Sequence, residues 1–405
     1  MNCSANAFRL PILAVFLLLT VPVPLLRADP ITRIPPGQAD GTSAAVVVDS
    51  VPLVFSTQLL PLKPDGTPVS DSASVQVDHL LSTLESALGA GSSDRLVKLN
   101  FTVATDAAAA EVRGRLAARY AGPNKPAVAF VAGKLSRADV AVTLDAVAVD
   151  TTLVEGRVAR RGSEVLVPLA MNPGDPHLTR VTTGSFVFVA GQAEKGENIA
   201  EATRNTMRSL AATLEQLGLT FADVVSVRSF LSPMAETPAA LAEIRKFYGG
   251  AQSFVEWTAA GSIEIELIAA APSPTAEPRD PVEFLTPTGM QSSPVFSRVA
   301  RTHGKSLIFV SGLYGKSSNA GTEEVTEIFS GLELTLKQAG SNLRHLAKAT
   351  YFVSTEEASA KLNELRPKYF DPQRPPAASK AAVTGTGMPG KTLTLDMIAV
   401  PAPRE

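Results

Sequence analysis

One order of secondary-structure signals occurs three times along this chain, and that repeat limits the possible folds more than any other feature. The clearest member of each repeat is an amphipathic helix whose apolar residues recur every three or four positions before a glycine. The three helices, with their glycines, fall within 77–89, 207–218 and 325–340. The repeating unit is a whole domain, which favours three tandem domains over a solenoid of short repeats.

The elements around this helix also recur in a fixed order. Each copy opens on two strand-like runs that resemble a hairpin, and after the helix come a strand, a second short helix and two further strands. The second helices end on tyrosines that we expect to anchor them against the sheet, namely Tyr120, Tyr248 and Tyr369. The pattern predicts a β-β-α-β-α-β-β unit in copies spanning 44–150, 164–271 and 281–402.

A unit of this kind has two helices, which cover one face of its sheet and leave the other face to be buried elsewhere. Three covalently linked copies can bury these faces against one another around a pseudo-threefold axis. The sequence therefore predicts an α+β protein in which one chain, as a monomer, forms an intramolecular pseudo-trimer.

The N-terminus has the features of a secretory signal. Arg9 precedes an apolar run over 10–26, and the small residue Ala28 follows it. A membrane anchor is the alternative, but prolines within the run leave too little uninterrupted helix to span a bilayer. We expect 1–28 to be a signal peptide and 29–43 a flexible segment. The mature protein is then exported to the periplasm or outside the cell, without a stable membrane anchor.

The overall composition excludes several classes of function. The net charge is -2 and the basic residues form no dense run, so a nucleic-acid surface is not expected. Cys3 is the single cysteine and lies in the predicted signal peptide, which leaves no thiol chemistry. The histidines are not spaced as metal ligands and no glycine-rich phosphate loop precedes a helix, so we expect neither a metal nor a cofactor. They are His79, His177, His303 and His345.

Short motifs recur within the copies in one order. They are AGQ at 190–192 and IEIELI at 263–268 in the second copy, SG at 311–312 and PAAS at 376–379 in the third, and STQ at 56–58 in the first. In this order the motifs resemble the RidA (YjgF) family, also called endoribonuclease L-PSP. The resemblance implies a chorismate-mutase-like fold and ligand clefts between neighbouring units. It also implies that Gly191, Gln192, Ser311 and Gly312 line such clefts.

The resemblance implies a chemistry as well. Active family members hydrolyse imines and enamines derived from amino acids, with an arginine for the substrate carboxylate and a glutamate as the acid/base group. The arginine position falls on Val128, Gln252 and Ala378 in the three copies. The glutamate position falls on Thr143, Glu264 and Thr394. Glu264 is therefore the candidate catalytic residue, and Gln252 a candidate donor to a neutral or weakly anionic ligand.

These residues leave several functions open. The first is deaminase-type hydrolysis that depends on Glu264 and is weak or lost. We expect the substitution Gln252→Arg to raise this activity. The second is a non-catalytic pseudo-trimer that binds a small ligand or a partner. Ribonuclease activity follows only from the family's other name and lacks a basic patch to support it. Glu264 could instead face solvent beside Glu266, and Trp257 is expected in the core.

Overall fold

The structure is a computed structural model of the 405-residue chain. It describes residues 1, 29–35, 41–150, 165–166, 178–182, 184–258, 261–272, 280–291, 293–317 and 321–403. The predicted signal peptide lies outside the described residues, apart from its first residue. His177 and most of the segment between the first two copies also lie outside them.

The predicted order of elements is confirmed in all three copies. The first comprises β2 (Ala45–Asp49), β3 (Leu53–Ser56), α1 (Ala73–Leu88), β4 (Leu96–Val103), α2 (Asp106–Arg119), β5 (Ala127–Ala132) and β6 (Val142–Val149). The second comprises β8 (Leu178–Val181), β9 (Ser185–Gln192), α3 (Ile199–Gln216), β10 (Val224–Leu231), α4 (Thr237–Ile244), β11 (Ala251–Glu256) and β12 (Ile263–Ala271). The third comprises β14 (Val299–Thr302), β15 (Ser306–Val310), α5 (Thr322–Gln338), β16 (Leu346–Val353), α6 (Glu356–Leu365), β17 (Ala377–Ala382) and β18 (Leu393–Ala399). A short strand precedes each copy: β1 (Ile31–Ile34), β7 (Val165–Leu166) and β13 (Val282–Leu285).

Local sequence explains where the helices begin and end. Thr105 and Thr355 cap α2 and α6 by accepting hydrogen bonds from Ala108 N and Ala358 N. The glycine that follows the first helix of each copy has a positive φ, which a residue with a side chain rarely adopts. These are Gly89, Gly218 and Gly340. The three helix stops seen in the sequence are therefore real chain reversals.

The strands form three six-stranded sheets, and the opening strands correct one expectation. The two opening strands of a copy do not pair with each other. In the first copy, β2 pairs with β15 of the third copy, and β3 pairs with β8 of the second. In the third copy, β14 pairs with β9 of the second. Each sheet thus holds four strands of one copy and two strands that lead into another. Without a hairpin partner β3, β9 and β15 would be open edges, and the strands of the neighbouring copy cover them instead.

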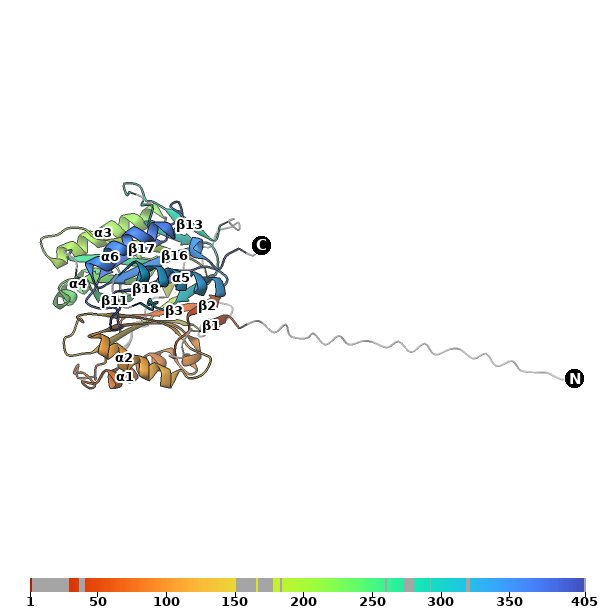
Figure 1. Ribbon diagram of the computed structural model, residues 1–405, viewed down its shortest axis with the longest axis horizontal. Coiled ribbons are helices and arrows are strands. Elements are labelled where there is room, and N and C mark those ends of the chain that lie inside the picture. The colour runs from red at the N-terminus through yellow and green to blue at the C-terminus, as the bar shows by residue number, and fades with distance from the viewer. Residues whose placement is uncertain are drawn as a thin grey trace.

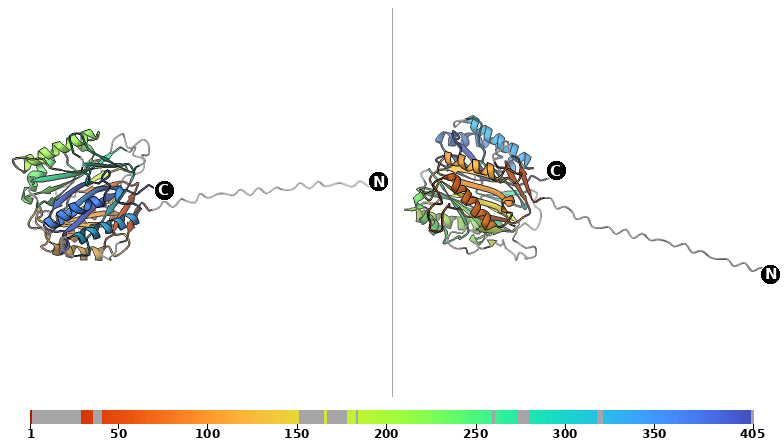
Figure 2. Two further views of the ribbon diagram at one scale, coloured as in Figure 1. Left: turned by 45° about the horizontal axis from the view of Figure 1, so that its top comes forward. Right: turned by 90° about the horizontal axis from the view of Figure 1, so that it is seen from below.

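The helices lie outside and the three sheets face inward (Figures 1 and 2). A separate apolar core fills the space between each sheet and its own pair of helices. A further core between the sheets takes side chains from every copy, including Phe55, Val147, Phe188, Ile268, Phe309 and Ile398. The sheet faces that the helices leave bare are therefore buried against one another. Within the described residues, none of the helices is long and apolar enough to cross a membrane.

Candidate functional site

Charged side chains from all three copies meet at the centre of the molecule. They come from equivalent strands: Lys98 and Asp145 from the first copy, Arg228 and Glu266 from the second, and Lys348 and Asp396 from the third. The register pairs Asn100 with Asp145, Arg228 with Glu266, and Thr350 with Asp396. Paired residues share one face of a sheet, so all of these side chains point inward. We call this group the axial cluster.

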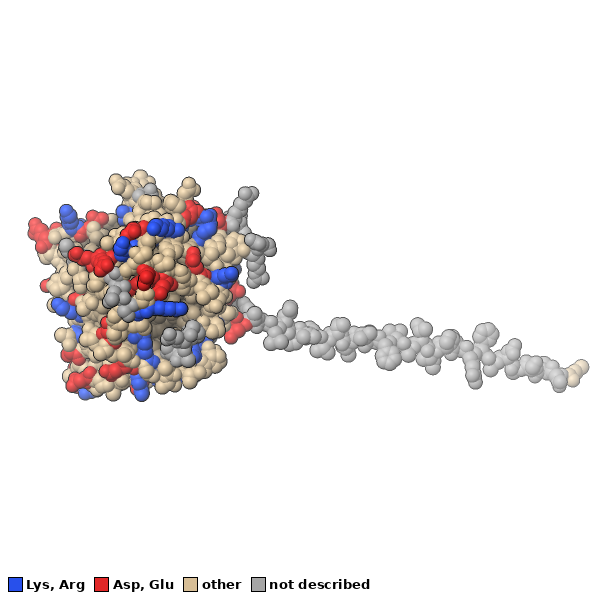
Figure 3. All heavy atoms as spheres, in the orientation of Figure 1, with Lys and Arg blue, Asp and Glu red and all other residues tan. Residues whose placement is uncertain are grey.

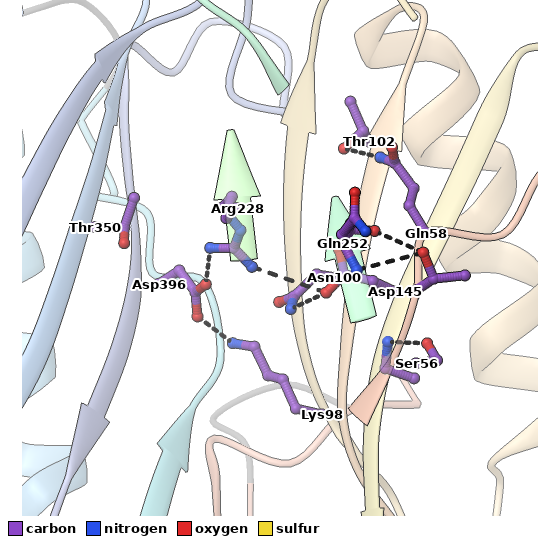
Figure 4. Close-up of polar contacts among 12 residues, drawn as sticks. Ser56, Gln58, Lys98, Asn100, Thr102, Asp145, Arg228, Gln252, Thr350 and Asp396 are labelled. Atoms are coloured by element: carbon purple, nitrogen blue, oxygen red, sulfur yellow. Dashed lines mark hydrogen bonds and ion pairs between the residues drawn. The ribbon is translucent and has the colours of Figure 1, made fainter. Parts of the chain in front are cut away.

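The charges of the axial cluster are neutralised between copies (Figure 4). Arg228 NH1 lies 2.6 Å from Asp396 Oδ2 and 3.6 Å from Glu266 Oε1. Lys98 Nζ lies 3.1 Å from Asp396 Oδ1, and Lys348 Nζ lies 2.8 Å from Glu266 Oε1. Burial alone would raise the pKa of Asp396, but the charges of Lys98 and Arg228 outweigh it and hold that pKa well below its usual value.

Asp145 is the least well paired member of the axial cluster. Its Oδ1 accepts a 2.9 Å hydrogen bond from Asn100 Nδ2 but lies 3.8 Å from Arg228 NH2. Burial raises the pKa of Asp145, and Arg228 offsets only part of that effect. A cavity of about 40 Å³ adjoins the cluster, enough for a water molecule and little more. The axial cluster therefore joins the copies and offers no room for a substrate.

The copies also meet at three equivalent junctions, where a turn of one copy packs on an edge strand of another. The turns are 56–58, 190–192 and 311–313, and the edge strands are β11, β17 and β5 respectively. Alternate residues of each edge strand direct their N–H and C=O groups out of the sheet. We name the junctions after Gln58, Glu264 and Tyr314, in that order.

The Gln58 junction is closed by the carboxamide of Gln58. Phe254 N–H donates to Gln58 Oε1 (3.1 Å), and Gln58 Nε2 donates to Phe254 O (3.0 Å). The same Nε2 donates to Thr143 Oγ1 (3.0 Å), where the first copy has threonine at the glutamate position. The backbone carbonyl of Gln252 also has a partner in this junction, because Gln58 N–H donates to Gln252 O (2.7 Å). Figure 4 shows this carboxamide between the two copies.

The Tyr314 junction is closed in another way. Gly312 N–H donates to Val128 O (2.8 Å), and Val128 N–H donates to Ser311 Oγ (2.8 Å). The guanidinium of Arg113 lies 4.3 Å from the centre of the Phe130 ring and donates to Tyr314 Oη (3.2 Å). Side chains of the protein thus occupy both of these junctions.

The Glu264 junction keeps an acid and lacks the closing carboxamide. Gly191 N–H donates to Ser379 Oγ (3.0 Å), which brings the second and third copies together. The Glu264 side chain lies against Gly191, where an added Cβ would come within 2.0 Å of Glu264 Oε1. Gln192 turns away from the junction, because its Nε2 donates to Thr213 Oγ1 of α3 (2.8 Å).

The edge strand at this junction presents a backbone pair that matches Phe254. Thr258 N–H, from another copy, donates to Ala382 O (2.8 Å), so that carbonyl points out of β17. Lys380 lies two residues earlier, and its N–H and C=O therefore point the same way. Among the described residues, no side chain bonds to this pair as Gln58 bonds to Phe254.

A surface depression lies beyond the Glu264 junction, at the end of β9. Ala193 has the turn position that Tyr314 has in the third copy. It lines a surface depression of about 540 Å³ together with Glu194, Lys195, Asn205 and Arg208. Glu264, Gly191 and the residues of β17 do not line this depression.

Glu264 is suited to exchange protons near neutral pH. Burial raises its pKa to about 7, the charge of Glu266 adds to this effect, and Arg298 opposes it. In the described part of the chain it has no hydrogen-bond partner. A carboxyl group with such a pKa can act as a general acid or a general base.

Comparison with known proteins identifies the family of the second copy. The model of the endoribonuclease L-PSP family matches residues 169–271. The second copy belongs to the RidA (endoribonuclease L-PSP) family. The first and third copies repeat its order of elements.

Solved structures with similarity to the chain include proteins named YjgF and RidA. YEO7 from yeast is 23% identical over 24% of this chain and 80% of its own, with a TM-score of 0.22. A YjgF-family protein from Neisseria meningitidis is 18% identical over 30% and 97%, with a TM-score of 0.24. RidA from an Antarctic Psychrobacter is 18% identical over 23% and 80%, with a TM-score of 0.22. A search of curated proteins gives no match.

The structure places the two candidate RidA-type residues of the second copy in different junctions. The backbone of Gln252 lies in the Gln58 junction, and its Nε2 donates to Tyr248 O (3.2 Å). Glu264 lies in the junction with the third copy. An arginine at position 252 would thus stand opposite Thr143 rather than Glu264, which corrects the expected effect of Gln252→Arg. Ala378 is the arginine position on the edge strand beside Glu264.

The other predicted residues fall where the turns meet the edge strands. Ser311 and Gly312 take part in closing the Tyr314 junction, Gly191 touches Glu264, and Gln192 points to α3. Their roles toward a ligand stay predictions. Glu264 does not simply face solvent, because it shares the inward face of β12 with Glu266. The described residues contain no cluster of metal-ligating side chains.

The sequence analysis missed the axial cluster. Its signal was a charged residue within a mainly apolar strand, found at Lys98, Arg228 and Lys348. Such residues are almost never fully buried without partners. The partners stand on the last strand of each copy, and only the folded chain brings them together.

Proposed function

We propose that this protein is a RidA-type small-molecule protein with one working site, at the Glu264 junction, where imine or enamine hydrolysis is weak. The observation that carries the proposal is the state of Glu264. It is the one glutamate kept at the three family positions, its pKa is raised to about 7, and its junction lacks the closing carboxamide.

The chemistry follows from that carboxyl group. As a carboxylate, Glu264 removes a proton from a water molecule that attacks the carbon of a C=N bond. As a carboxylic acid, it returns the proton to the leaving nitrogen. The net reaction converts an imine and water into a carbonyl compound and ammonia. An enamine first takes up a proton at carbon and then follows the same course.

The expected weakness has a physical cause. An amino-acid-derived imine carries a carboxylate, and the family's arginine position is Ala378 at this junction. A hydrogen bond to a charged group is worth about 1.5–3 kcal/mol. Its absence lowers binding of such a substrate by roughly one to two decades.

The test is ammonia release from freshly generated 2-aminoacrylate. We expect low turnover by the wild type and a further loss, on the order of 10²-fold or more, in Glu264→Ala. Ala378→Arg should raise the turnover that depends on Glu264. Gln252→Arg is the matched control, because it places the same charge opposite Thr143. Turnover that survives Glu264→Ala, or rises equally in the two arginine variants, would contradict the proposal.

A non-catalytic binding protein is the second candidate. It is favoured by the closure of two of the three junctions and by threonine at two of the three glutamate positions. Ligand binding without any Glu264-dependent turnover would select it. Ribonuclease activity has little support, since acidic and basic side chains are mixed on the face shown in Figure 3.

Two further proposals concern the state of the protein. We propose that residues 1–28 direct export and are then removed. The intact mass of protein from the native host tests this, and it should correspond to a chain that begins near Asp29.

We also propose a monomeric pseudo-trimer, because the copies already bury the sheet faces that separate subunits would bury. Light scattering during size exclusion should give the mass of one chain.

A further inference from the structure

We infer that the Glu264 junction binds small neutral molecules through a primary carboxamide, in preference to carboxylates. This inference rests on the site of the proposed function and names the class of its ligand. The protein itself supplies the template, because a carboxamide already occupies the equivalent Gln58 junction.

In the Gln58 junction, both the oxygen and the nitrogen of the Gln58 carboxamide form hydrogen bonds. Its oxygen accepts from Phe254 N–H, and its nitrogen donates to Phe254 O and to Thr143 Oγ1. The partners are thus one outward-facing backbone pair and the oxygen of the residue at the glutamate position. These distances are 3.0 to 3.1 Å, within the normal range for hydrogen bonds.

The Glu264 junction contains the same partners without the internal carboxamide. Lys380 supplies the outward-facing N–H and C=O, and Glu264 stands in place of Thr143. Gly191, which stands at the register position of Gln58, supplies no side chain there, and Gln192 bonds to Thr213. A ligand carboxamide can therefore accept from Lys380 N–H and donate to both Lys380 O and Glu264.

A carboxylate cannot form the hydrogen bonds that this junction offers to a carboxamide. It has no N–H for the carbonyl of Lys380, and its charge is repelled by ionised Glu264. Lys380 Nζ is engaged elsewhere, since it donates to Ser359 and Asn363, and Arg298 Nε donates to Gln291 O. With Ala378 at the arginine position, no guanidinium faces the ligand from β17.

The first experiment measures binding to the full-length mature protein by saturation-transfer NMR. The probes are propionamide, which copies the end of a glutamine side chain, and propionate, its charged counterpart. We expect propionamide to bind at least tenfold more tightly at pH 8, and Glu264→Ala to weaken that binding at least tenfold. Thr394→Ala in the Tyr314 junction is the control and should leave it unchanged. Equal or tighter binding of propionate would overturn the inference.

The second experiment removes the template. Gln58→Ala frees the Phe254 backbone pair and Thr143, so propionamide should raise the melting temperature of this variant more than that of the wild type. Propionate should not. Failure of propionamide to stabilise a folded Gln58→Ala variant would overturn the inference. If that variant does not fold, the binding ratio in the wild type alone decides it.

The outcomes separate this inference from the proposed function. Glu264-dependent release of ammonia that propionate inhibits and propionamide does not would leave the function standing and refute the ligand class. Tight binding of propionamide without any turnover would support the ligand class and refute the hydrolase.

Discussion

The Gln58 and Glu264 junctions are built from the same parts and reach opposite results. Each joins a turn after an early strand to the edge strand of another copy. In the first, threonine stands at the glutamate position and a glutamine side chain fills the space between the copies. In the second, the acid remains, and Gly191 stands at the register position of Gln58 with the Glu264 side chain against it. In this comparison, the junction that a side chain closes is also the one that has lost the glutamate. Each junction must therefore be assessed separately as a candidate site.

The largest expected effect tests whether the junctions share one rigid centre. Arg228→Met leaves three carboxylates buried near a neutral side chain, and Asp145 loses the guanidinium that opposes the effect of its burial. Removing one member of a buried ion pair costs about 3–5 kcal/mol. Chemical denaturation should show that loss. A cost below about 1 kcal/mol would mean that the axial cluster does not hold the copies together.

The next effect separates the two glutamines. Gln58→Ala removes the carboxamide bonds to Phe254 and Thr143 and leaves a cavity, which should cost about 2–4 kcal/mol in the free energy of unfolding. Gln192→Ala removes one bond, to Thr213, and should cost about 1 kcal/mol. Similar losses in the two variants would contradict the distinction between a closed and an open junction.

The charge of Glu264 should appear in the dependence of stability on pH. Its folded pKa is about 7, above the ordinary value of 4.5, so the folded state holds this proton more tightly than the unfolded state does. The resulting stability is fully present below pH 4.5 and is lost as the pH rises through 7. Relative to Glu264→Gln, the wild type should lose on the order of 2 kcal/mol across that window, after allowance for partial exposure. Parallel pH profiles for the two proteins would show an ordinary carboxyl group.

The smallest expected effect concerns the contact between Gly191 and Glu264. A Cβ at position 191 meets the carboxylate, which is the movable end of its side chain, so Gly191→Ala should cost about 1 kcal/mol. The cost should vanish in a Glu264→Thr background, because the first copy combines Gln58, at the register position of Gly191, with Thr143. Gly114→Ala in α2, where an added Cβ meets nothing within 4 Å, is the control. An unchanged cost in both backgrounds would place the strain elsewhere.

Much of the fold could be predicted from the sequence. The spacing of Val77, Leu80 and Leu84 gave a helix, and all three become buried in the core of the first copy. The order of elements and the family of the second copy followed from patterns of this local kind. These patterns can be recognised in the sequence because the spacing of apolar residues in a helix or strand involves only positions that are close together in the chain.

The site could be predicted only in part. Glu264 was found from its strand motif, and the structure gives it an unusual environment. The structure places Gln252 in a different junction from Glu264, since a motif read within one copy does not show which copy lies opposite. The hairpin prediction failed for the same reason. The β2–β15 and β3–β8 pairs, like the β9–β14 pair, join residues far apart in sequence.

The sequence by itself determined the three units, their helices and strands, and the residues that replace the family's arginine. Only the tertiary structure decided the exchange of opening strands, the meeting of Lys98, Arg228 and Asp396, and the junction to which Glu264 belongs. The physical reason is that propensity and periodicity act over a few residues. Sheet edges and buried charges are satisfied instead by whichever copy the folded chain brings next to them.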